Sequence, residues 1–144
     1  MEISNYTEVQ KEFILEFCKG AFEEWEWIPE KKNIYGNVTG ELYRFKKKFR
    51  FLDKEFELAV EVTVYYKNPI DGKKILNVYV YSAYYPTFPW RMWDDQCVRM
   101  LQHCTGWSEN YCWKVRKEFT LLMEEECRNL EERMRHIVQK AATV

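Results

Sequence analysis

Histidine, serine and glycine are scarce in this 144-residue chain, and their scarcity limits the chemistry that it can perform. The chain has two histidines, His103 and His136, and three serines, Ser4, Ser82 and Ser108. Nucleophilic catalysis needs a nucleophile, a base and a group that orients the base, and none of these residues falls in a recognisable motif. The five glycines form no loop that would cradle a phosphate. The sequence therefore predicts a protein that is not an enzyme and that has no catalytic residues and no cofactor.

Neither sign of charge is in excess, because 22 basic residues stand against 23 acidic ones. No overall field therefore attracts nucleic acid or a membrane surface. No apolar run approaches the roughly 18 residues that a membrane span needs. The first residues show neither the basic start nor the apolar core of a secretion signal. These absences predict a cytoplasmic protein that does not bind membranes.

The five cysteines are odd in number, and a cytoplasmic setting keeps thiols reduced. Cys97, Cys104 and Cys112 lie close to His103 in the sequence, which raises the question of a zinc site. Cys97 and Cys104 are two helical turns apart, about 10.5 Å at a rise of 1.5 Å per residue. That separation is too large for one zinc ion bound at roughly 2.3 Å. The sequence therefore predicts buried free cysteines and no metal site.

Apolar residues, by contrast, are plentiful: they make up 47% of the chain, and aromatic residues alone make up 17%. A chain of this length and composition buries enough surface for one well-packed core. The length predicts a single domain that spans residues 1–144.

The first predicted element is a helix over residues 6–28, which Pro29 is expected to end. Its apolar residues Val9, Phe13, Phe17 and Ala21 recur every fourth position and form the predicted core stripe, which Ile14, Cys18 and Trp25 widen.

Alternation of apolar and polar residues predicts two half-buried strands over residues 41–52 and 55–66. A two-residue turn at Asp53-Lys54 would pair residues whose numbers sum to 107, so that Arg50 faces Glu57. A third strand is predicted over residues 75–85.

Two further helices are predicted, a short one over residues 91–104 and a long one from Ser108 to about residue 141. The predicted fold is α+β, with a three-stranded antiparallel β-meander packed against the N-terminal helix and the long C-terminal helix. The order of elements is α-β-β-β-α-α. The last helix would be some 45 Å long. Because this exceeds what three strands cover, its apolar stripe predicts a homodimer through the C-terminal helix.

The densest aromatic run of the chain extends from Tyr84 to Trp93 and contains two prolines. Proline is disfavoured in central strands and helix interiors, so we expect a rigid corner here, with Trp93 pointing into the core. Tryptophan, tyrosine and arginine dominate the hot spots of protein interfaces. The predicted partner-binding residues are Tyr84, Tyr85, Phe88, Trp90, Arg91 and Trp93.

These features predict a small non-catalytic binding protein that docks on a protein partner through an aromatic patch. One form of this function is an inhibitor of a nuclease or defence system, encoded by a phage or mobile element. A second aromatic cluster, Trp25 and Trp27, is interleaved with Glu23, Glu24, Glu26 and Glu30. It has two interpretations, an acidic rim around a packed tryptophan or a docking patch for a basic partner.

Two alternative functions remain open at this stage. One is a small-ligand-binding domain whose aromatic pocket lies between sheet and helices and is lined by Tyr79, Tyr81 and Trp113. The other is RNA binding through the basic strand residues Arg44, Lys46, Lys48 and Arg50. Against the RNA alternative, the predicted hairpin places glutamates opposite two of these basic residues.

Overall fold

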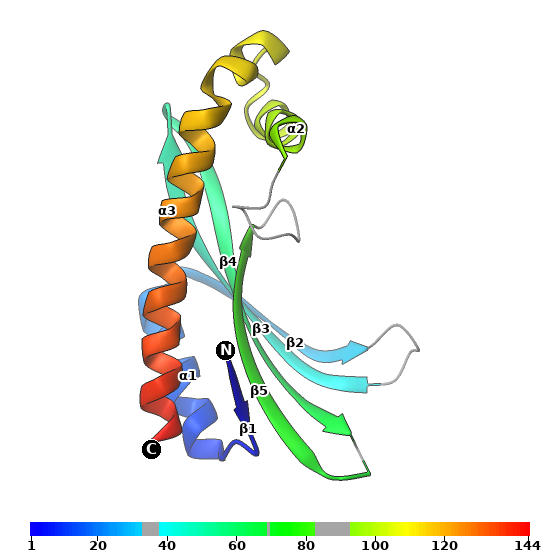
Figure 1. The fold of residues 1–144 in the computed structure, drawn as a ribbon. Helices are drawn as coiled ribbons and strands as arrows, with labels where there is room; N and C mark the ends of the chain where they lie inside the picture. The colour runs from blue at the N-terminus through cyan, green and yellow to red at the C-terminus, as the bar shows by residue number, and fades with distance from the viewer. Residues whose placement is uncertain (33–37, 69, 83–92) are drawn as a thin grey trace.

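The computed structural model describes residues 1–32, 38–68, 70–82 and 93–144, which form one antiparallel sheet with helices packed on it (Figure 1). The elements are, in chain order, β1 (Glu2–Ser4), α1 (Glu8–Ala21), β2 (Glu24–Lys32), β3 (Val38–Phe51), β4 (Lys54–Asn68), β5 (Lys73–Ser82), α2 (Asp94–Thr105) and α3 (Glu109–Ala142). The strands are ordered β1-β5-β4-β3-β2, so β1, the first strand in the sequence, pairs with β5, the last one. In these described ranges no helix combines the length and apolar character required to cross a bilayer.

The α+β class and the antiparallel sheet are confirmed, but the three-stranded meander is wrong. Among the described residues the sheet has five strands, and the order of elements is β-α-β-β-β-β-α-α. The helix predicted over residues 6–28 ends at Ala21, because Phe22 is extended with φ −118° and ψ 140°. Pro29 does not end a helix but lies inside β2, an outer strand, where a missing N–H is tolerated.

The hairpin of β3 and β4 is present with a different register from the predicted one. The paired residues have numbers that sum to 105, so that Arg50 faces Glu55 rather than Glu57. The two-residue turn is Leu52-Asp53, whose φ angles of 48° and 63° fit a type I′ turn. A shift of two residues leaves every side chain on its predicted face, because the side chains of a strand alternate with a period of two.

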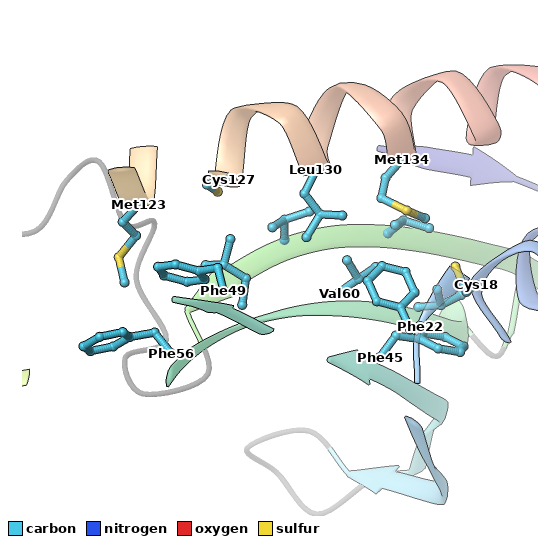
Figure 2. Close-up of a cluster of buried hydrophobic side chains, with 14 of the residues drawn as sticks. Cys18, Phe22, Phe45, Phe49, Phe56, Val60, Met123, Cys127, Leu130 and Met134 are labelled. Atoms are coloured by element: carbon cyan, nitrogen blue, oxygen red, sulfur yellow. The ribbon is translucent and has the colours of Figure 1, made fainter. Parts of the chain in front are cut away.

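The long helix α3 lies along the sheet and packs against it (Figure 1). Its 34 residues extend about 51 Å, and the 14 and 15 residues of β3 and β4 extend a similar 45 to 50 Å. Figure 2 shows α3 side chains directed at the strands, among them Leu130 above Val60. The buried row of α3 includes Cys112, Phe119, Met123, Cys127, Leu130, Met134 and Ile137. The chain's own sheet covers most of this stripe, which removes the reason for expecting a homodimer, and the homodimer through the C-terminal helix stays a prediction.

The first helix buries part of the predicted stripe. Ile14, Leu15 and Cys18 are buried, whereas Val9 is 60% exposed. Phe13, Phe17 and Ala21 are partly buried and pack against the core, so Val9 and Trp25 are the members of the predicted stripe that stay exposed.

We predict that Phe119→Ala lowers the free energy of unfolding by about 3–5 kcal/mol, the usual cost of emptying a large buried site. Phe119 is fully buried, and its ring centroid lies 4.7 Å from that of Phe56 and 5.2 Å from that of Phe51. Leu121→Ala is the matched control on the same helix, because Leu121 is 58% exposed and should change stability by at most about 0.5 kcal/mol. Urea unfolding of both variants measures the difference, and equal losses would contradict the packing described here.

Candidate protein-binding surface

The strand β2 forms one edge of the sheet and has β3 as its one neighbour among the described strands. Residues 24–28 pair with residues 42–46 in regular register, and register shifts follow between Ile28 and Lys31. Bulges and prolines are common means of protecting an edge from further pairing. The regular part of the exposed edge is therefore confined to residues 24–28, before Pro29.

Two tryptophans project from this edge strand on the side of the sheet that faces the helices. Trp25 and Trp27 pair with Phe45 and Tyr43 of β3, and the indoles stack on these rings at centroid distances of 6.1 and 6.3 Å. The ammonium of Lys19 lies 4.9 Å from the Trp25 ring. Despite these contacts the tryptophans remain 44% and 52% exposed. Aromatic rings that stack on a neighbouring strand and are exposed to solvent on their other side resemble interface hot spots.

Glutamates occupy the alternate positions of the same strand and point to the other face of the sheet. Glu24 lies 2.7 Å from the ammonium of Lys48, and Glu26 lies 2.7 Å from the guanidinium of Arg44. We call Glu24, Trp25, Glu26 and Trp27 together the β2 patch. Trp25, the two glutamates of the patch, Glu23 and Lys46 line a surface hollow of about 430 Å³, large enough for a side chain of a partner.

The basic row of β3 is already engaged with carboxylates. Arg44 binds Glu26 and also Glu61, the latter at 3.0 Å, and Lys48 binds Glu24 and lies 3.7 Å from Glu55. A phosphate would have to compete with these neighbours.

The two other basic residues of the row are Arg50 and Lys46. The guanidinium of Arg50 donates to the carbonyl of Asp53 at 2.8 Å, and Lys46 stands opposite Glu24 on β2. RNA binding through Arg44, Lys46, Lys48 and Arg50 stays a prediction, which these contacts do not favour.

A buried glutamate ties three strands together on the outer face of the sheet. Glu61 of β4 is 8% exposed and accepts hydrogen bonds from Arg44 on β3 and from the Tyr81 hydroxyl on β5 at 2.7 Å. Burial first, and then the hydrogen bond to Glu61, raise the pKa of Tyr81 well above its ordinary value.

The three residues of the predicted small-ligand pocket are not brought together. The hydroxyl of Tyr79 lies 3.4 Å from that of Thr63 on the outer face of the sheet, the same face as Tyr81. Trp113 lies on α3, across the sheet, where the guanidinium of Arg116 sits 4.9 Å from its ring.

The aromatic run predicted to bind a partner is described at one residue. Tyr84, Tyr85, Phe88, Trp90 and Arg91 lie outside the described residues. Trp93 is 74% exposed, and its backbone N–H donates to the Gln96 side chain at the start of α2. The expectation that Trp93 points into the core is therefore wrong, since this residue precedes the helix and the buried side chains of α2 begin at Cys97.

The cysteines have the character of core residues. Burial raises the pKa of Cys18 and Cys127 to about 12 and that of Cys104 to about 11, so these thiols stay protonated near neutral pH. Across the described ranges, no three side chains of histidine, cysteine, aspartate or glutamate are grouped as a metal site would require.

No protein-family model, curated protein or solved structure matches this chain. The β2 patch is the feature that sequence reasoning placed wrongly, since residues 24–28 were assigned to a helix. The alternation Glu-Trp-Glu-Trp is the signal that predicts a strand there.

The raised pKa of Tyr81 predicts how the stability of the protein changes at alkaline pH. A tyrosine whose pKa is raised on folding stabilises the protein fully below its unfolded pKa of about 10, and this contribution is lost as pH rises further. Tyr81→Phe should therefore lose less stability than the wild type between neutral pH and a pH above about 10. Urea unfolding at the two pH values measures both losses. Because the other tyrosines and the cysteines are common to both proteins, equal losses would show that Tyr81 is not perturbed.

Proposed function

We propose that this protein is a non-catalytic binding protein that docks on a protein partner through the β2 patch. The observation that carries the proposal is the exposure of Trp25 and Trp27 on an edge strand, although both indoles are stacked on rings of β3. Exposed aromatic side chains grouped on one surface are typical of interaction sites. Their stacking also orders them before binding, which lowers the conformational entropy lost on docking.

The strand geometry suggests how a partner engages the patch. An extended segment that adds to the edge of residues 24–28 would form main-chain hydrogen bonds and place alternate side chains on the two faces of the sheet. Apolar side chains of the partner would lie opposite Trp25 and Trp27. Basic ones would lie opposite Glu24 and Glu26, whose charges are partly offset by Lys48 and Arg44. The tryptophans, rather than the glutamates, therefore supply most of the binding energy.

Trp93 is a further exposed indole and belongs to the aromatic run that the sequence predicts to bind a partner. Its contribution, like that of Tyr84, Tyr85, Phe88, Trp90 and Arg91, stays a prediction. An inhibitor directed at a nuclease or defence system is one form of the proposed function and equally stays a prediction.

The double variant Trp25→Ala/Trp27→Ala tests the proposal. A hot-spot aromatic residue contributes about 2 kcal/mol or more, so the yield of a protein partner that co-purifies from native cells should fall at least tenfold. Leu121→Ala is the control, because it removes a large exposed side chain on α3 and should leave the yield unchanged. Circular dichroism and urea unfolding establish that each variant is folded. A folded double variant that retains its partner would contradict docking through the β2 patch.

A further inference from the structure

The helix α1 carries a row of apolar side chains, Val9, Phe13 and Phe17, that the rest of the chain covers only in part. Ile14, Leu15 and Cys18 are buried and define the inward direction of the helix. Successive residues turn by about 100°, so Val9 and Phe13 lie close to the opposite, outward direction. An amphipathic helix packed on one side normally presents polar residues there. Phe13 and Phe17 are partly buried against the core, but Val9 is 60% exposed, so packing within the chain leaves part of this apolar row open to solvent.

These side chains form a shallow hollow on the surface. Val9, Phe13 and Phe17 line it together with Glu8, Glu12 and Glu16, and its volume is about 740 Å³. The three apolar residues and the three glutamates are each spaced by four positions. They therefore form two parallel rows along the helix.

The charge beside the apolar row is acidic, and the basic residues of α1 lie elsewhere. Lys11 pairs with Glu8 at 2.9 Å on the inner side of the helix, and Lys19 lies over the Trp25 ring. On α3, the guanidinium of Arg133 lies 5.2 Å from the Phe17 ring. A second copy of the chain is a poor occupant, because antiparallel pairing of two α1 helices would place both acidic rows on one side.

Gly20 provides an independent observation on the same face. It is exposed in the last turn of α1, and a Cβ built on it would meet no atom within 4 Å. Its φ is not positive, and the helix ends through the extended Phe22, so neither backbone geometry nor capping requires glycine. Glycine destabilises a helix relative to alanine. A bare backbone at the end of the apolar row lets another backbone approach closely.

We propose that the outer face of α1 binds a basic amphipathic helix of a partner protein. The apolar residues of that helix, spaced by four, would fill the hollow over Val9, Phe13 and Phe17, and its lysines or arginines would lie along Glu12 and Glu16. Gly20 would allow the two backbones to approach at one end. The proposal does not depend on the β2 patch, which lies on a different element and takes an extended segment.

A dye-labelled synthetic peptide with one leucine row and one lysine row on an alanine helix is the probe, and fluorescence anisotropy measures its affinity for the full chain. We expect saturable binding that weakens as salt is raised, because the paired charges are exposed. Glu12→Lys/Glu16→Lys should weaken binding at least about tenfold by charge repulsion. Glu118→Lys/Glu125→Lys makes the same change of charge at exposed positions on α3 and should leave the affinity unchanged.

The variant Gly20→Leu distinguishes an effect on peptide binding from an effect on stability. A leucine should raise the thermal midpoint of the chain, because it is a better helix former than glycine and meets no neighbour. It should at the same time weaken peptide binding several-fold by blocking close approach. If Gly20 has no part in docking, Gly20→Leu would change the thermal midpoint and leave the peptide affinity unchanged, which would contradict close approach at this glycine.

Three results would overturn the proposal. The first is equal binding of a peptide with the same composition in scrambled order, or no saturable binding of the patterned peptide. The second is an equal effect of the α1 and α3 charge reversals. The third is a dimer in light scattering whose mass changes with the α1 reversal, which would show that a second copy occupies this face.

Discussion

The contact between α3 and the sheet is the constraint on which the rest of the structure depends. The helix and the two longest strands have nearly equal lengths, so one apolar row can be buried from Cys112 to Ile137 without interruption. This contact decides which face of every strand is the inner one. Because side chains alternate along a strand, it also places Glu61 and its hydrogen-bond partners Arg44 and Tyr81 on the outer face.

The same constraint leaves two peripheral surfaces with a shared chemistry. On β2, tryptophans face the helix side of the sheet and glutamates face the other side, and on α1 an apolar row lies beside an acidic one. Both surfaces come from residues 1–35, which carry eight acidic and four basic residues although the whole chain is nearly neutral. An aromatic and acidic surface complements partners that are apolar and basic. The first quarter of the chain is therefore the part whose character is best explained by binding.

Local patterns predicted the elements whose signal is long and self-consistent. The β3–β4 hairpin and α3 were predicted because their periodicity persists over ten or more residues. The register was wrong because the turn uses Leu52 at a positive φ, a conformation that leucine rarely adopts. The three-residue β1 is too short to show a period, and β2 was missed because its alternation directly follows a helical pattern.

The sequence by itself determined the α+β class, the long elements, the alternation of faces along each strand and the acidic, aromatic character of the β2 segment. These properties follow from the period of the side chains and from composition, which are local. Only the tertiary structure decided that Val9 lies outside the core and that Trp25 and Trp27 stay exposed. Exposure depends on which distant element covers a residue. Here the decisive elements are α3 and the edge position of β2, and no local pattern encodes either.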